Sequence, residues 1–231
     1  MTDYVKNNLA AVKEEICLAE RSAGRLGATT LIAAVKYATN EELGELISLG
    51  VCDVGENRVQ QLLAHMPAYE GKSVRLHFIG TLQKNKIKYI IDKVYAIHSV
   101  DSISLAEEID RHAAKHGCTP RVFVEVNIGR EPAKGGVMPE DAEALCRAVT
   151  ALPNLVLAGL MTMAPPCESE VEYRAYFAQT RDLAKDIWQF LGRTDRPQLS
   201  MGMSGSFGAA IMEGADMVRV GRRLFAHESK E

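Results

Sequence analysis

A lysine at the end of an apolar run is the first candidate for chemistry in this chain. Lys36 directly follows residues 31–35 (LIAAV), a run that predicts a buried strand with a site at its C-terminal tip. Because an ammonium group is costly to desolvate, a half-buried lysine shifts toward the neutral amine that forms Schiff bases with carbonyl compounds. The alternative is a strand-end lysine that reaches solvent, as most lysines do.

Two segments near the C-terminus have the composition of a phosphate site. Residues 201–206 (MGMSGS) lead from a predicted strand into a helix of small residues at 207–213, and Gly221-Arg222 follow the last predicted strand. Backbone N–H groups and the positive end of a helix dipole favour an anion at such a place. Ser204 offers a hydroxyl donor, and Gly221 lets the backbone approach a ligand closely. Two glycine-containing turns with a helix cap are the structural alternative.

Arg219 lies inside the apolar stretch 217–220 (MVRV), where a charge is unexpected without a partner. A guanidinium group only donates hydrogen bonds, so an arginine facing a pyridine nitrogen leaves that nitrogen unprotonated. The ring is then a weaker electron sink. The alternative is an ion pair at the strand end with Glu56 or Asp216. A lysine for an aldehyde, donors for a phosphate and an arginine for a ring nitrogen together describe pyridoxal 5′-phosphate.

These residues need a fold that brings distant strand ends together. Short β-branched runs alternate with amphipathic stretches along the chain, which predicts a parallel sheet built from βα units. A helix comes first, with apolar residues at steps of three or four from Val5 to Ala19. About eight strands are expected, at residues 31–35, 51–55, 75–79, 94–98, 121–127, 155–161, 198–201 and 217–220.

About eight βα units and one leading helix predict a TIM-type (β/α)8 barrel that occupies residues 1–231 as a single domain. An open doubly wound sheet is the competing fold, and the strand count favours the barrel. Functional residues should then gather where the strands end at the C-terminal face. The polar residues and glycines expected there are Lys36, Glu56, Asn57, Arg58, His77, Gly80, Asn127, Thr162, Ser204, Arg219 and Gly221.

Three helix starts have recognisable signals. Thr39 and Glu42 have the spacing of a capping box, and Pro139 fits the first turn of a helix that carries Leu145 and Val149. A long helix is expected from Ser169 to beyond residue 183, toward residue 188.

The composition excludes several classes of protein. A formal charge of −3 without a basic stripe argues against nucleic-acid binding, and the apolar runs are too short to span a membrane. The five cysteines are scattered and predict reduced thiols in a cytoplasmic protein. The histidines lack metal-ligand spacing, so no metal is expected.

Six further motifs follow one another along the chain: AVK at 34–36, GENRVQ at 55–60, HFIGTLQKNK at 77–86, GLM at 159–161, SMGMS at 200–204 and VRVG at 218–221. With these motifs the chain resembles the pyridoxal phosphate homeostasis proteins, single-domain relatives of the alanine racemase barrel. The resemblance implies a Schiff base at Lys36, phosphate near Ser204 and Gly221, Arg219 at the pyridine nitrogen and Asn57 beside the cofactor ring.

The chain departs from the family pattern at two positions. Arg222 stands where threonine is usual, which removes a hydroxyl donor and adds a charge that either pairs with phosphate or turns to solvent. Ser206 stands where an acidic residue is common. Lys134 matches a lysine-containing loop of the family, either as a second contact for the aldehyde or as a solvated loop lysine.

The resemblance implies a cytosolic carrier or buffer of pyridoxal phosphate, active in vitamin B6 and amino-acid balance and without established turnover. We therefore expect a non-enzymatic monomer that hands its cofactor to apo enzymes dependent on pyridoxal phosphate. The alternative is an amino-acid racemase, which needs acid/base groups on both faces of the substrate carbon. In the racemases a C-terminal β domain supplies the second group, and with Glu231 soon after the last strand we expect none here. A cofactor-free Schiff-base aldolase would leave Arg219 unexplained.

Overall fold

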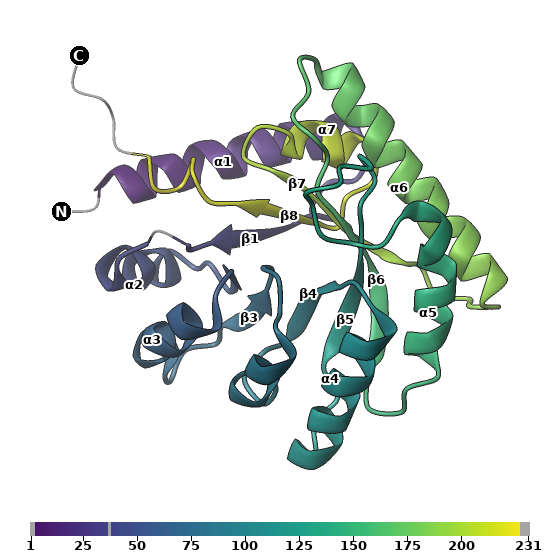
Figure 1. Cartoon of the computed structure of the whole chain (residues 1–231). Coiled ribbons are helices and arrows are strands. Elements are labelled where there is room, and N and C mark those ends of the chain that lie inside the picture. The colour runs from purple at the N-terminus through teal and green to yellow at the C-terminus, as the bar shows by residue number, and fades with distance from the viewer. Residues whose placement is uncertain (1–2, 37, 227–231) are drawn as a thin grey trace.

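Eight parallel strands close into a barrel in the order of the sequence, with β8 pairing back to β1 (Figure 1). The computed structural model describes residues 3–36 and 38–226, so the C-terminal tail to Glu231 lies outside the described residues. The predicted TIM-type barrel is confirmed, and the open doubly wound sheet is wrong because a closed barrel has no free edge. The strands are β1 (Thr30–Ala34), β2 (Asp53–Glu56), β3 (Arg75–Phe78), β4 (Ala96–Val100), β5 (Arg121–Val126), β6 (Val156–Thr162), β7 (Gln198–Met203) and β8 (Met217–Val220).

Helices surround the barrel, and the predicted leading helix α1 (Asp3–Ser22) packs against α7 and α2 (Figure 1). The capping box at Thr39 and Glu42 is present, with the two reciprocal hydrogen bonds at 3.2 and 2.6 Å. The other helices are α2 (Asn40–Ser48), α3 (Val59–Tyr69), η1 (Lys84–Tyr89), α4 (Ile103–His116), η2 (Pro139–Asp141), α5 (Ala142–Thr150), α6 (Glu170–Phe190) and α7 (Phe207–Met212).

Most predicted strand bounds differ from the observed ones by one or two residues, and two differences, at Pro139 and at Val94, have a clear local reason. Pro139 does not open the α-helix that carries Leu145 and Val149. It lies in η2, a 3₁₀ turn closed by the Asp141 N–H on the Met138 carbonyl at 3.0 Å, and α5 follows. Short 3₁₀ turns are common before an α-helix. Strand β4 starts two residues later than predicted, because Val94 N–H bonds back to the preceding turn at Ile90.

Apolar and polar side chains share the barrel interior, and the buried polar ones include His77, His98 and Ser200. Strand residues alternate between the interior and the helical layer outside. Six buried apolar side chains from the strands form a separate cluster in the barrel interior: Ile32, Ala96, Phe123, Ala158, Met161 and Met217.

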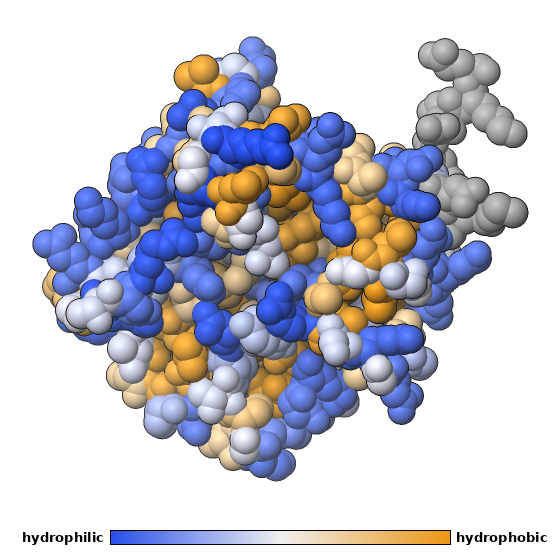
Figure 2. Space-filling model, turned by 180° about the vertical axis from the view of Figure 1, so that it is seen from behind, coloured by the Kyte–Doolittle hydropathy of each residue, from blue (hydrophilic) through white to orange (hydrophobic). Residues whose placement is uncertain are grey.

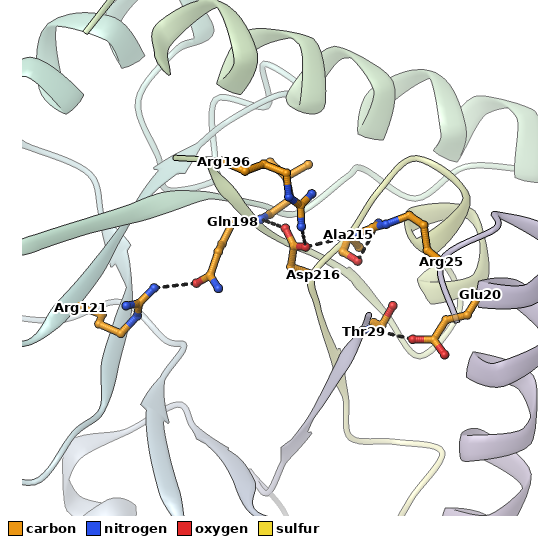
Figure 3. A network of polar contacts seen from close by, with 9 residues as sticks. Glu20, Arg25, Thr29, Arg121, Arg196, Gln198, Ala215 and Asp216 are labelled. Carbon is orange, nitrogen blue, oxygen red and sulfur yellow. Dashed lines mark hydrogen bonds and ion pairs between the residues drawn. The ribbon is translucent and has the colours of Figure 1, made fainter. Parts of the chain in front are cut away.

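A polar network closes the N-terminal end of the barrel, opposite the expected site (Figure 3). The buried Asp216 carboxylate accepts the Leu199 N–H at 2.8 Å, pairs with Arg25 at 3.0 Å and also pairs with Arg196. In barrels this end contributes to stability, whereas the other end carries function. We therefore assign Asp216 to the stability of the fold, not to the site.

Replacing Asp216 with asparagine is expected to lower the free energy of unfolding by about 1–3 kcal/mol, because two guanidinium groups lose their charged partner at a buried position. Chemical denaturation measures this loss. Ligand affinity at the opposite end should stay unchanged, and a large change in affinity with little loss of stability would contradict the assignment.

The outer surface is mixed in character. On the face shown in Figure 2, hydrophobic atoms are visible in separate areas between projecting hydrophilic side chains. Among residues 3–36 and 38–226, no helix is long and apolar enough to cross a membrane.

Candidate functional site

A cavity of about 510 Å³ opens among the loops that follow the strands at the C-terminal end of the barrel. Its volume lies within the range of roughly 300–1,000 Å³ typical of small-molecule sites. The structure brings together here every residue predicted to bind the cofactor. These residues are Lys36, Asn57, Ser204, Arg219, Gly221 and Arg222.

The apolar walls of the cavity were not predicted from the sequence. They consist of Ile79 after β3, Met163 after β6, Met203 at the end of β7 and Phe225 near the C-terminus. Met203 is part-exposed and lines the cavity. Such walls suit a flat ring, and single apolar residues at loop starts leave no pattern in a sequence.

A larger cavity of about 640 Å³ lies on the outside of the barrel, between α1, α6 and α7. Among the described residues that line it, only Ser204 belongs to the predicted set and none is a lysine. The inner cavity is therefore the better candidate, although it is smaller.

Lys36 lies two residues after the last residue of β1 and is held in place through its backbone. The Gln61 side chain on α3 donates to the Lys36 carbonyl at 2.7 Å and to the Val35 carbonyl at 3.3 Å. Lys36 itself is exposed, so the prediction of a half-buried lysine is wrong. The reason is that the strand ends at the open mouth of the barrel. Gln61 is a positioning residue that the sequence reasoning missed.

The loops after β7 and β8 meet beside the end of β1. The Gly221 N–H donates to Ser204 Oγ at 3.4 Å, and a Cβ atom at Gly221 would lie 2.7 Å from the Ala34 carbonyl oxygen. Only glycine therefore fits beside β1. Ser206 closes the adjoining turn, because its Oγ accepts the Met203 N–H at 3.1 Å.

Arg219 is buried inside the barrel and reaches the floor of the cavity. Its Nη1 donates to the Ser200 carbonyl at 2.7 Å and to Ser200 Oγ at 2.8 Å, and its Nη2 donates to the Thr162 carbonyl at 2.9 Å. Three of its five N–H donors are thus engaged by described residues, and two remain for a ligand. Burial lowers the pKa of Arg219 to about 10, so the group stays charged at neutral pH.

The alternative of an ion pair for Arg219 is not what the structure shows. Asp216 pairs with Arg25 and Arg196 at the other end of the barrel. Glu56 points away from the interior and accepts hydrogen bonds from His65 and Tyr69 on α3, at 2.7 and 2.5 Å. A buried guanidinium that keeps two donors on a cavity is an arrangement suited to a ligand acceptor.

Comparison with known proteins decides the family. The family model for the N-terminal domain of alanine racemase matches residues 8–228. A pyridoxal phosphate homeostasis protein of Aquifex aeolicus is 42% identical over 218 residues, which cover 94% of this chain and 95% of the relative. The chain belongs to the pyridoxal phosphate homeostasis protein family. The predicted resemblance is thereby confirmed.

Solved structures place this family member among related barrels. PipY of Synechococcus elongatus, solved with pyridoxal phosphate bound, has a TM-score of 0.84 and 31% identity, covering 96% of this chain and all (100%) of that one. An alanine racemase of Clostridium difficile has a TM-score of 0.76 at 18% identity and shows the shared fold. The match covers 99% of this chain and 58% of the racemase.

Close packing of the loops after β2 and β3 fixes the position of Asn57, which also lines the cavity. A Cβ atom at Gly80 would lie 2.1 Å from the Asn57 carbonyl oxygen, so glycine lets the loops after β2 and β3 touch. His77, by contrast, lies deep in the barrel and not at its mouth. Its position on β3 turns the side chain inward.

The loop after β5 folds back over the strand end. Asn127 N–H donates to the Val137 carbonyl at 2.8 Å, and the Asn127 side chain donates to the Glu131 carbonyl at 2.8 Å. Asn127 therefore shapes the loop and does not line the cavity. Lys134 is exposed on this loop, which agrees with the solvated alternative.

Glu125 is a buried carboxyl group on β5 that the sequence reasoning did not single out. Burial and the nearby Asp101 raise its pKa to about 7, while Arg219 opposes the shift. Glu125 does not line the cavity, so we assign it no contact with a ligand.

Proposed function

We propose that the chain binds pyridoxal 5′-phosphate on Lys36 and releases it to other proteins, so that it takes part in intracellular vitamin B6 homeostasis and amino-acid balance without turnover of its own. The observation that carries this proposal is the single cavity shared by Lys36, Arg219 and the Ser204–Gly221 pair. The names of the relatives and the pyridoxal phosphate bound to PipY support it.

The residues present fit the cofactor at each of its polar ends. The aldehyde carbon of the cofactor is an electrophile to which the Lys36 amine adds, with loss of water, to give a Schiff base. Ser204 and the backbone at Gly221 would hold the phosphate, with Arg222 at the rim. Arg219 would donate to the ring nitrogen, and Asn57 would lie beside the ring.

The cavity favours a carrier over a racemase. Racemisation needs two groups that exchange protons, one on each face of the substrate carbon. Among the described residues that line the cavity, Lys36 is the one side chain able to act as a base, because arginine stays protonated. The exposed mouth at Lys36 also gives water and acceptor proteins access to the bond.

A transfer assay tests this function. Protein loaded with pyridoxal phosphate is mixed with an apo enzyme that needs the cofactor, with a phosphatase present to destroy free cofactor. We expect the apo enzyme to gain activity faster than it does from the same amount of free cofactor. No gain in activity would contradict the carrier. Steady conversion of L-alanine to D-alanine by the loaded protein alone would instead support the racemase.

We further propose that the chain acts as one domain and as a monomer in the cytoplasm, where apo enzymes are its partners. Light scattering at micromolar concentration tests the monomer, and a mass twice that of the chain would contradict it.

Arg222 is expected to make a small, salt-dependent contribution to affinity. It is exposed at the cavity rim, so its attraction to phosphate is screened. Arg222→Gln should weaken cofactor binding about two- to fivefold at low salt and have no effect at high salt, as measured by spectroscopic titration. Arg223→Gln is the matched control, because Arg223 pairs with Glu15 on α1. Equal effects of both variants would mean that Arg222 does not meet the phosphate.

A further inference from the structure

A line of hydrogen bonds crosses the barrel interior, starting below the cavity. It runs from Arg219 to Ser200 at 2.8 Å, from Ser200 Oγ to His98 Nδ1 at 2.9 Å and from His98 Nε2 to His77 Nδ1 at 2.9 Å. It ends at Asp53 Oδ1, 2.9 Å from His77 Nε2. These side chains come from five strands, β8, β7, β4, β3 and β2. We call Ser200, His98, His77 and Asp53 the polar chain.

All members of the polar chain are buried. Ser200, His98 and His77 are fully inaccessible, and Asp53 is 6% exposed. The His98 ring stacks on Phe123 with a centroid distance of 4.3 Å, and this contact fixes the ring plane. Because an unpaired buried polar group is costly, each member depends on its neighbours for a partner.

With both imidazole rings neutral, the polar chain has one arrangement of hydrogen atoms. The Asp53 carboxylate only accepts, so His77 donates to it from Nε2 and, when neutral, accepts at Nδ1 from His98 Nε2. That leaves His98 Nδ1 as an acceptor, which takes the hydrogen of the Ser200 hydroxyl. Ser200 Oγ in turn accepts from Arg219, which only donates. Every bond therefore points in the same direction, away from the cavity.

The charges at the far end match this arrangement. Burial would raise the pKa of Asp53, but hydrogen bonds from His77 and Arg75 outweigh it and hold the pKa below its usual value. Burial above all, with the charge of Arg219, lowers the pKa of His98 well below its usual value. Asp53 is thus an acceptor and His98 is neutral at physiological pH.

We propose that the polar chain positions Arg219 for the cofactor, an inference that rests on the proposed function. Both Nη1 hydrogens of Arg219 are used by Ser200, and this fixes the plane of the guanidinium group. The Ser200 hydroxyl keeps a lone pair toward Arg219 because its hydrogen is taken by His98. The two remaining donors of Arg219 are thereby held toward the cavity, where the ring nitrogen would lie. None of the four members of the polar chain lines the cavity themselves.

Two pairs of variants distinguish the positioning of Arg219 from a general effect on the stability of the fold. Ser200→Ala removes the hydroxyl that joins Arg219 to His98. Ser99→Ala is the matched control, because Ser99 is a buried serine on β4 whose hydroxyl has no partner among the described residues. At His98, asparagine keeps an acceptor near the Nδ1 position and thus the bond to Ser200. Glutamine keeps a donor near Nε2 and thus only the bond to His77.

The readouts are the dissociation constant of pyridoxal phosphate, the position of its visible band when bound and the melting temperature of each variant. Ser200→Ala and His98→Gln should weaken binding about three- to tenfold and shift the band. Ser99→Ala and His98→Asn should bind within about twofold of the unaltered protein, even where they melt earlier. Affinity losses that follow the melting temperature across all four variants would overturn positioning.

Nitrogen NMR of the apo protein tests the hydrogen arrangement independently of the cofactor. His98 should be neutral with its hydrogen on Nε2, and His77 should carry a hydrogen on Nε2. A hydrogen on Nδ1 of His98 would reverse the direction of the polar chain and overturn the inference. If the unaltered protein binds no pyridoxal phosphate, the proposed function fails and positioning fails with it. If it binds but Ser200→Ala and Ser99→Ala behave alike, only positioning fails.

Discussion

Lys36→Ala protein is expected to be colourless after mixing with pyridoxal phosphate and removal of the free cofactor, and to bind the cofactor at least about a hundredfold more weakly than the unaltered chain. The reason is that phosphate and ring contacts remain while the covalent bond is lost. Because Lys36 is exposed, its replacement should change the free energy of unfolding by less than about 0.5 kcal/mol. Absorbance titration and chemical denaturation measure the two quantities separately.

Two further lysine variants sharpen this result. Lys36→Arg keeps the positive charge but has no nucleophilic amine, so it should be as colourless as the alanine variant. Lys134→Ala should keep the full colour and affinity, since Lys134 does not line the cavity. Colour that survives in Lys36→Arg and disappears in Lys134→Ala would move the covalent site to the loop after β5.

Glu125→Gln is expected to stabilise the apo protein by about 2–3 kcal/mol at pH 8. The pKa of Glu125 is raised from 4.5 to about 7 by burial and Asp101. Between these two values the unfolded chain releases the proton while the folded chain keeps it, so stability falls as pH rises from about 4.5 to about 7. Below this window both states are protonated, and above it the loss is complete. A glutamine cannot ionise and avoids the loss.

Denaturation of both proteins from pH 4 to pH 8 measures this difference. The stabilities should agree near pH 4 and separate as pH rises through the window. Glu143→Gln, at an exposed position on α5, is the control and should leave the curve unchanged. A Glu125→Gln protein that is less stable than the unaltered chain at pH 8 would mean that Arg219 stabilises the Glu125 carboxylate more strongly than burial penalises it.

Much of the barrel is predictable because its strands are read from local signals. Parallel strands buried on both faces are continuous apolar runs, and the eight runs in this sequence correspond to the eight strands. Boundaries shift by one or two residues because the register with a neighbouring strand, not the apolar run, decides where pairing begins. Val94 shows this, since its N–H bonds to the turn before β4.

The site was predictable for residues whose chemistry is unusual at their position. Lys36 and Arg219 stand out because a charge ends or interrupts an apolar run, and both line the cavity. The exposure of Lys36 was not predictable, since it depends on how the loops around it close. The polar chain was missed for a similar reason. His77 and His98 lie on the paired strands β3 and β4, but Ser200 lies on β7, and only closure of the barrel brings it to His98.

Borohydride reduction followed by peptide mass mapping tests the central claim most directly. The protein is loaded with pyridoxal phosphate, reduced, digested and searched for the peptide that carries the added phosphopyridoxyl group. The account predicts that the group lies on Lys36, in the segment between Gly27 and Glu41. A modified Lys134 with an unmodified Lys36, or no modified peptide from a protein that binds the cofactor, would contradict it.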